Sequence, residues 1–359
     1  MFPDSKKYKG IILFFILFIF LNAAFVSAQV VNPPKPKVEP TPKGAVTPNI
    51  IISPKPPKNK VWKPKKTIVN ESDTPAEKSI AVDAKVKIQF CVEAGKVKVN
   101  GWERNEIRAF VSNGSQIGFK VLQKSRQNNN PVWVKAVGFD PAKDTESDVE
   151  ECLSGEEIEF DVPRGAIVNI KSDESETSVE SVRKVTVKNL GGNIFLNNIS
   201  EGIEAITYQG GITVEKSSGA IALDTTSGNI IALDVSSSEI GDIFRAKTNN
   251  GAVILRNVEQ RQVEVGSNSG SINFNGELLS GGQYLFRTQN GSISLAIPEK
   301  SSCVINASYG FGAFNSELPL QNTKKTNSSG VQNLTGQLGS GEATLNLTTY
   351  NGRINIKKQ

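Results

Sequence analysis

The sequence TNNGAVIL at residues 248–255 recurs as SNSGSINF at 267–274 and as TQNGSISL at 288–295. Each copy has a hydroxyl residue, two further residues, a glycine and then alternating apolar residues, and another alternating stretch precedes it. Alternation with a period of two is typical of β-strands that bury one side. The C-terminal half of the chain is therefore predicted to consist of strands joined at a glycine corner.

The glycine corners recur at a nearly constant distance. Their steps along the chain are 18, 18, 23, 19, 21, 19 and 42 residues, and we interpret the last step as two turns of 21. A repeat near 20 residues indicates a β-solenoid, in which successive coils stack on one another. Asn-Gly pairs within the repeat are also typical of hairpin turns, so a meander of β-hairpins is the alternative. The corner glycines are Gly192, Gly210, Gly228, Gly251, Gly270, Gly291, Gly310 and Gly352.

Stacking predicts a role for each position of the repeat. The apolar residue two positions after the glycine is expected to point inward, as at Ile212, Val253, Ile272, Ile293 and Ile354. The glycine is able to take a positive φ at the corner, which a β-branched residue could not. The Thr and Ser hydroxyls are expected to form a ladder that bonds the backbone amides of the corner.

The first 28 residues have the layout of a secretory signal peptide. Three lysines precede an apolar run at 11–26, and small residues end at Ala28, where cleavage is expected. An uncleaved membrane anchor is the alternative, although this run is shorter than the ~20 residues that a spanning helix needs. In either case the protein is predicted to be exported, to the periplasm or the cell surface.

Residues 29–80 are predicted to be a disordered linker rich in proline and lysine. Within them, residues 31–66 hold ten of the 17 prolines and nine lysines against one acid, Glu39. This composition favours an extended spacer, or a polybasic contact with an anionic wall polymer or lipid headgroups. The whole chain carries +5, but residues 67–359 carry −5, so no nucleic acid partner is predicted.

Residues 81–165 also alternate, but they lack the repeat. Stretches such as 85–90, 106–111 and 158–162 are predicted to be strands. We expect this section to be an N-terminal β cap that covers the open strand edges of a solenoid at 166–359. The predicted fold class is therefore all-β: a mostly parallel β-solenoid with an N-terminal cap, preceded by a disordered tail.

The chain has no histidine and three cysteines, Cys91, Cys152 and Cys303, without a CxxC spacing, so neither a metal site nor a cofactor is predicted. Export favours a disulfide.

Cys91 and Cys152 flank strands of the same cap and are predicted to be bonded. In the chain-entropy model this bond would contribute about 4 kcal/mol to the free energy of unfolding. Cys303 shares the parity of inward residues and is predicted to be a free, buried thiol. Three unpaired thiols are the alternative.

The order of the motifs resembles one known family. AGKVKVNGWERNEIRAF is followed by EIEFDVPRGAIVNI, by the repeats, by SSCVINASYGFGAFNSELPL and by a terminal TTYNGRINI. Over about residues 85–359 this order is similar to the bacterial adhesin-like β-solenoid family, an exported group of unknown biochemical function. The resemblance implies a right-handed solenoid, an envelope or surface location and no known catalytic residues.

Two functions from different classes follow. The first is a non-enzymatic adhesin or scaffold that binds an envelope component, a glycan or a surface protein. The alternative is a polysaccharide-active enzyme on the same fold, which needs two carboxyl groups ~5–9.5 Å apart. Asp224 and Asp234 each follow an Ala-Leu pair and are the candidates for such a pair. Solvated turn residues are the other interpretation of these two acids, and no catalytic residue is predicted.

Overall fold

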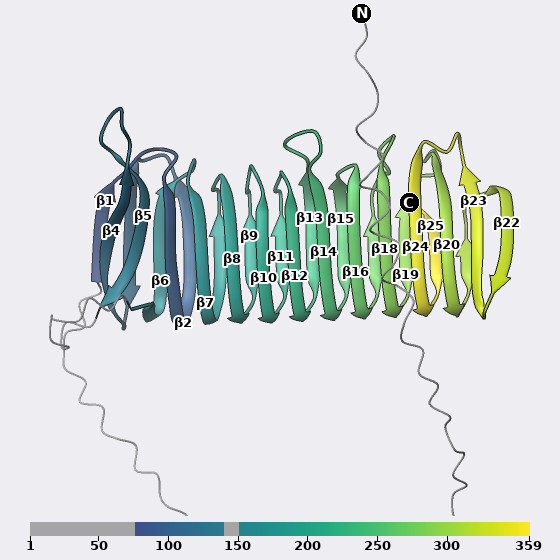
Figure 1. Cartoon of the computed structure of the whole chain (residues 1–359), viewed down its shortest axis with the longest axis horizontal. Coiled ribbons are helices and arrows are strands. Elements are labelled where there is room, and N and C mark those ends of the chain that lie inside the picture. Colours follow the sequence, from purple (N-terminus) through teal and green to yellow (C-terminus); the bar gives the residue numbers. More distant parts are fainter. Residues whose placement is uncertain (1–75, 140–150) are drawn as a thin grey trace, which may run out of the picture. The chain divides into compact units, whose positions relative to one another are not determined.

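The computed structural model describes residues 76–139 and 151–359. These residues form 25 strands and no helix. Most neighbouring strands run parallel, in a long stack of coils with antiparallel strands at its two ends (Figure 1). The predicted all-β, mostly parallel β-solenoid is confirmed. The hairpin alternative is wrong for the repeats, because their strands pair with those of neighbouring coils.

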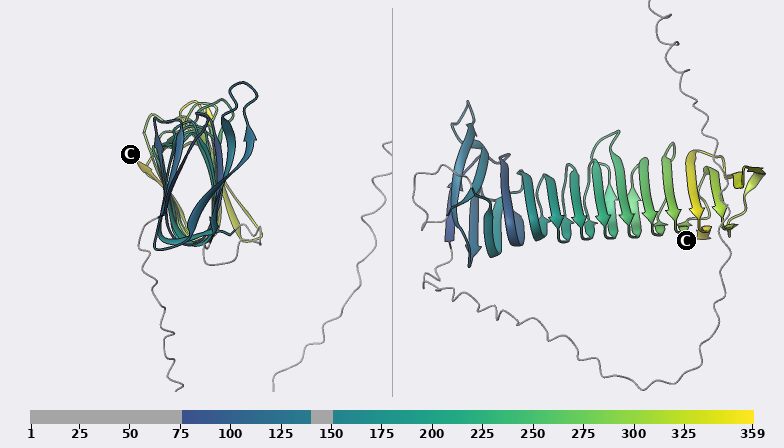
Figure 2. Two further views of the ribbon diagram at one scale, coloured as in Figure 1. Left: turned by 90° about the vertical axis from the view of Figure 1, so that its left-hand side faces the viewer. Right: turned by 60° about the horizontal axis from the view of Figure 1, so that its bottom comes forward.

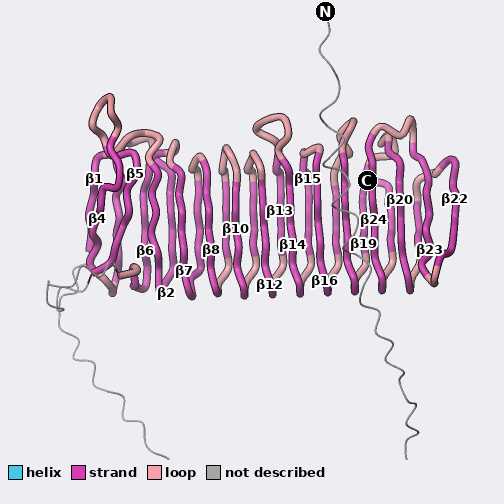
Figure 3. The backbone as a smooth tube through the Cα atoms, in the orientation of Figure 1, coloured by secondary structure: helices cyan, strands magenta, loops and turns pink. Residues whose placement is uncertain are grey.

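Each regular coil contributes one strand to either side of the stack (Figure 2). Loops along the two edges join these sides (Figure 3). Parallel, in-register pairing places equivalent residues of successive coils in rows along the stack. Face A consists of β8 (Lys184–Gly191), β10 (Ile203–Gln209), β12 (Ile221–Ser227), β14 (Ile243–Asn250), β16 (Gln262–Ser269) and β18 (Gln283–Asn290). Face B consists of β9 (Ile194–Asn197), β11 (Ile212–Glu215), β13 (Ile230–Ser236), β15 (Val253–Glu259), β17 (Ile272–Asn275) and β19 (Ile293–Ile297).

The core is one continuous apolar layer between the two faces. Along the strands of the two faces every second side chain points into it, which is the consequence of the two-residue period of a β-strand. Aromatic rings also pack there, with Phe274 against Phe286 at 5.5 Å between ring centroids. The five residues predicted to point inward are all fully buried, namely Ile212, Val253, Ile272, Ile293 and Ile354.

The corner glycines form a ladder, but for a different reason from the predicted one. A Cβ at Gly251 would lie 1.9 Å from the carbonyl oxygen of Gly228, and a Cβ at Gly270 would lie 1.8 Å from that of Gly251. Neither glycine has a positive φ, although Gly192 and Gly210 do. The general requirement is therefore close approach between stacked backbones, and most corners do not use the positive φ that glycine allows.

The predicted hydroxyl ladder exists, with the opposite polarity. Each hydroxyl donates to the carbonyl oxygen of the corner glycine in the preceding coil, as from Thr248 to Gly228 at 3.0 Å. The corner amides do not need the hydroxyls, because they bond backbone carbonyls of the next coil, as Gly228 N does with Asn250 O. The same bond is made by Thr207, Thr225, Ser267, Thr288 and Thr349.

The N-terminal end stacks out of chain order. The long strand β2 (Lys87–Trp102) lies between β7 (Ile167–Glu180) on one side and β5 (Pro131–Phe139) and β6 (Leu153–Pro163) on the other. Antiparallel partners then cover the end. β3 (Glu106–Ser112) pairs with β6, β1 (Ala76–Ala81) pairs with β3, and β4 (Gln116–Lys124) pairs with β5.

Two features of this end differ from the predicted domain boundaries. Residues 76–80 belong to β1, so the folded part begins inside the predicted linker at 29–80. Within the predicted cap at 81–165, β2 is an inner coil that pairs with β7 along nearly its whole length. The cap proper consists of the antiparallel strands, which bond the outermost strand edges as predicted for a cap.

The C-terminal end also stacks out of chain order, which corrects the interpretation of the 42-residue step. The coil of β24 (Ala343–Asn351) and β25 (Ile354–Lys358) lies between β18 and β19 and the earlier coil of β20 (Cys303–Phe311) and β21 (Phe314–Ser316). The intervening residues are not a regular turn. They form β22 (Gln321–Ser328) and β23 (Val331–Leu338), an antiparallel pair that covers β20.

This inserted coil also moves one predicted corner. In the stacked register Gly312, not Gly310, follows Gly352, and a Cβ at Gly312 would lie 1.9 Å from the oxygen of Gly352. Gly310 instead lies opposite Tyr350, where the absence of a side chain leaves room for the tyrosine ring. The ring of Tyr350 is in edge contact with Phe311 at 5.7 Å between centroids.

The predicted signal peptide at 1–28 and the linker up to residue 75 lie outside the described residues. Within 76–139 and 151–359, no helix is long and apolar enough to cross a membrane.

Candidate functional site

The two acids considered for catalysis lie on different sides of the stack. Asp224 is an exposed residue of β12 on face A, and Asp234 is an exposed residue of β13 on face B. Asp234 has a positive φ of 54° and accepts a hydrogen bond from Asn257 Nδ2 at 2.8 Å. The core separates the two carboxylates, so the structure does not bring them together as a catalytic pair.

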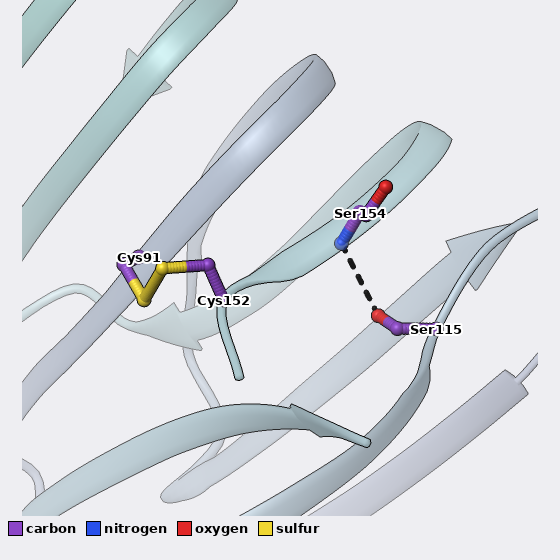
Figure 4. The surroundings of a disulfide bond; sticks show 4 residues. All are labelled: Cys91, Ser115, Cys152 and Ser154. Atoms are coloured by element: carbon purple, nitrogen blue, oxygen red, sulfur yellow. Dashed lines mark hydrogen bonds between the residues drawn. A yellow bond between two sulfur atoms is a disulfide. The ribbon is translucent and has the colours of Figure 1, made fainter. Parts of the chain in front are cut away.

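A disulfide joins Cys91, in β2, to Cys152, directly before β6 (Figure 4). The two Cα atoms are 4.7 Å apart, and the bond links residues 61 positions apart in the chain. Next to it, Ser154 N donates to Ser115 Oγ at 3.2 Å, which ties β6 to the loop before β4. The third cysteine, Cys303, is unpaired and fully buried in β20.

Peptide mapping without reductant is expected to recover one linked peptide pair, containing Cys91 and Cys152. Burial raises the pKa of the Cys303 thiol to about 11, so this thiol stays protonated at neutral pH. We expect iodoacetamide at pH 8 to leave Cys303 unmodified in the native protein and to alkylate it after denaturation. A disulfide containing Cys303, or two free thiols at Cys91 and Cys152, would contradict this assignment.

The disulfide stands at a break in face A. β2 pairs with β5 only over Lys87–Gln89 and changes to β6 from Val92 onward. Where the partner strand changes, a cavity of about 440 Å³ opens beside Cys91. We call this cavity the basic notch and define it by its six polar side chains, which are Gln89, Lys135, Asn169, Lys171, Thr186 and Lys188.

The six residues come together because of strand register. Gln89, Asn169 and Thr186 stand in one row across β2, β7 and β8, and Cys91, Lys171 and Lys188 stand in the next. Lys135 of β5 lies opposite Gln89. None of the lining residues is acidic.

Three contacts organise the side chains of the basic notch and its surroundings. Trp133 Nε1 donates to Gln89 Oε1 at 3.2 Å, while the Lys87 ammonium lies 4.4 Å from the Trp133 ring centroid. Lys188 Nζ forms an ion pair with Glu204 at 2.9 Å. Among the described residues, Lys171 has no ion-pair partner.

A second cavity, of about 570 Å³, lies at one edge of the stack. The uneven repeat explains it, because a coil with the short 19-residue step lies between two longer ones with steps of 23 and 21. Its walls are the loops at 237–242 and 279–281, and acidic residues predominate in its lining: Glu239, Asp242 and Glu259 against Arg261.

The carboxylate of Asp242 holds the 237–242 loop of this second cavity together by hydrogen bonds. It accepts hydrogen bonds from Ser238 N, Ser238 Oγ and Glu239 N at 2.8, 3.1 and 2.8 Å. Burial alone would raise the pKa of Asp242, but these hydrogen bonds outweigh it, and the pKa lies below its ordinary value. A general acid for glycoside hydrolysis needs a raised pKa, so Asp242 does not suit that role.

The basic notch was not predicted from the sequence. Two of its four strands, β2 and β5, are far in the chain from β7 and β8, and its lysines are ordinary outward residues of alternating stretches. A single signal was present, namely the pairing of Cys91 with Cys152, which predicts that β2 approaches the segment before β6. The second cavity had a clearer signal in the unequal steps of the repeat.

A family model and two solved structures are similar to this chain. Residues 80–357 match the family model described as Toastrack DUF4097, which confirms the family predicted from the motif order. A "putative cell adhesion protein" of Clostridium sporogenes is 12% identical, with 79% of this chain and 100% of that chain covered and a TM-score of 0.23. A "putative lipid binding protein" of Parabacteroides distasonis is 10% identical, with 79% and 96% covered and a TM-score of 0.25. A search of curated proteins finds no match.

Proposed function

The chain belongs to the Toastrack DUF4097 family, and we propose that it is an exported, non-enzymatic scaffold that binds a component of the cell envelope through the outer faces of its solenoid. One observation carries the proposal. The outward side chains stand in straight rows along a stack whose backbones are hydrogen-bonded from coil to coil. Such a surface is rigid and extended, which suits an extended partner.

The rows are themselves held in place by side-chain contacts. On face A, Arg245 donates to Glu264 at 2.9 Å. In the two coils that continue the faces at the C-terminal end, Asn306 donates to Asn346 at 3.0 Å and Asn315 donates to Asn355 at 3.1 Å. Because ordered side chains lose less entropy on binding, these rows favour a role in binding. The separation of Asp224 from Asp234 disfavours the enzymatic alternative.

Export and the tail complete the proposal. The signal-like residues 1–28 would direct the chain out of the cytoplasm, where the Cys91–Cys152 disulfide persists. The segment 31–66, with nine lysines against one acid, would reach an anionic wall polymer or lipid headgroups and hold the solenoid near that surface.

Deleting residues 31–66 is expected to lower sedimentation with purified cell wall or with anionic vesicles several-fold at ~0.1 M salt. The attraction of the tail is electrostatic, so in the full chain its contribution should fall as the screening length shortens to ~3 Å at 1 M salt. A matched control replaces 31–66 by a Gly/Ser linker of equal length, which keeps the reach but not the charge. Equal sedimentation of all three proteins would contradict the role of the tail.

A further inference from the structure

We propose that the basic notch binds an anionic glycan, meaning here a polymer of sugars or sugar alcohols with phosphate or carboxylate groups. This inference rests on the proposed envelope-binding function and names the ligand class of one site on face A. Its lining combines lysine side chains with amide and hydroxyl groups and contains no acid. Ammonium groups bind phosphate and carboxylate, while amides and hydroxyls bind sugar hydroxyls.

The lysines of the basic notch are arranged at a cost to the fold. Lys171 and Lys188 lie directly opposite each other on neighbouring parallel strands and point outward. Like charges in this position repel, because adjacent strands are only ~4.8 Å apart. Along the strands β10 to β18 of face A the facing charges are opposite instead, as for Arg245 with Glu264 and for Asp224 with Lys247. A bound anion between Lys171 and Lys188 would remove the repulsion.

Glu204 offsets this repulsion only in part. Glu204 lies in β10, which pairs with β8 on the side opposite β7, and its carboxylate forms one ion pair with Lys188. Lys171 is left without an ion-pair partner among the described residues. An ammonium group has three donors, so Lys188 can bind an anion while it keeps Glu204.

The polar row beside the lysines presents donors that the protein does not use. The indole nitrogen of Trp133 can only donate, so its bond fixes the Gln89 oxygen and leaves the Gln89 amide nitrogen as a donor in the notch. Asn169 and Thr186 continue this row and have no hydrogen-bond partner among the described side chains. At the other end of the stack the equivalent amides, those of Asn306 and Asn346, bond each other.

Shape and charge favour a polymer strand over a membrane surface. The basic notch is recessed where β2 changes partner, and a recess admits a chain of sugars but not a flat bilayer. The Cys91–Cys152 bond joins β2 to β6 at this recess, so the recess is held in place. Because residues 67–359 carry −5 overall, attraction of a polyanion to the solenoid must come from a local cluster of lysines.

Lysine footprinting on the full chain tests the proposal without any variant. Mass spectrometry measures the rate at which each lysine is acetylated, so the lysines of the tail and those of the basic notch are followed separately. The probes are poly(glycerol phosphate), polygalacturonate, neutral dextran and phosphatidylglycerol vesicles. We expect one or both anionic polymers to slow acetylation of Lys171 and Lys188 about fivefold, dextran to have no effect, and Lys324 and Lys325 to react at unchanged rates. The phosphate and carboxylate arms distinguish the two anions.

A variant pair gives the matching affinity measurement. Lys171→Gln/Lys188→Gln and Lys324→Gln/Lys325→Gln remove the same charge, the first pair from the basic notch and the second from the exposed strand β22 at the opposite end. The first pair is expected to weaken binding of the protected polymer about tenfold more than the second. All four lysines are exposed, and equal melting temperatures would show that both variants fold.

Three outcomes would overturn the inference. They are protection of tail lysines alone, protection of Lys171 and Lys188 by vesicles but by neither polymer, and equal loss of affinity in the two double variants. The failure of the inference is distinguishable from failure of the proposed function. If full chains sediment with cell wall while Lys171 and Lys188 stay reactive, the scaffold binds the envelope elsewhere.

Discussion

Ile272→Asp is expected to lower the free energy of unfolding by more than about 4 kcal/mol. Ile272 is fully buried in β17 and lies between Val253 and Ile293 of the neighbouring coils. A carboxylate there would lose its water without gaining a partner, because the inward row around it is apolar. Equilibrium denaturation in urea, followed by far-UV circular dichroism, measures the effect.

Asn273→Asp is the matched control, because it introduces the same residue one position further along β17. Asn273 is exposed, so its replacement is expected to change stability by no more than ~0.5 kcal/mol. If Ile272→Asp were as mild as this control, Ile272 would be exposed and the inward parity of the repeat would be wrong.

The same parity explains why the coils could be predicted from the sequence. Ile272, Ile293 and Ile354 have the same spacing from a corner glycine. Because side chains alternate with a period of two, one residue known to point inward determines which other residues of the strand are buried. The repeat length then favours stacked coils over a meander of β-hairpins. The local sequence was enough to predict these positions, because each coil needs the same inward apolar residues, corner glycine and hydroxyl as its neighbours.

That equivalence is also the reason that the stacking order at the ends could not be predicted. The coil with Thr349 and Gly352 offers the same apolar positions and the same hydroxyl as the coil with Thr288 and Gly291. Any of these coils can therefore stack on another. The order depends on whether the pair β22–β23 lets the chain fold back, so that Thr349 bonds Gly291 across 58 residues.

The basic notch escaped prediction for a related reason. A row on a face is made of one residue per strand, so its members are distant in the chain. Lys171 and Lys188 lie at equivalent positions of two successive coils. Gln89 lies near them only because β2 pairs with β7. Such a site can be predicted only after the order of the strands in the sheet is known. At the N-terminal end no local sequence pattern indicates that order.

Gly251→Ala is expected to destabilise the protein by at least about 3 kcal/mol, although it adds a single methyl group. That methyl would lie 1.9 Å from Gly228 O, 2.6 Å from Gly228 C and 3.2 Å from Asn229 N. These are backbone atoms in a stack bonded on both sides, so the overlap can be relieved only by separating two coils. The separation would also strain the bonds from Thr248 to Gly228 and from Ser267 to Gly251.

Gly266→Ala distinguishes this clash from the general effect of replacing glycine. Gly266 lies in β16 without a positive φ, and the nearest atom to an added Cβ is Lys247 Cγ, a flexible side-chain atom at 3.9 Å. The unfolded chain loses freedom when glycine becomes alanine, so Gly266→Ala is expected to be neutral or stabilising by up to ~1 kcal/mol. Thermal and urea denaturation of both variants measure the difference. Equal stability of the two variants would show that the corner glycines are not in close contact, and the ladder would then have to be explained by turn conformation instead.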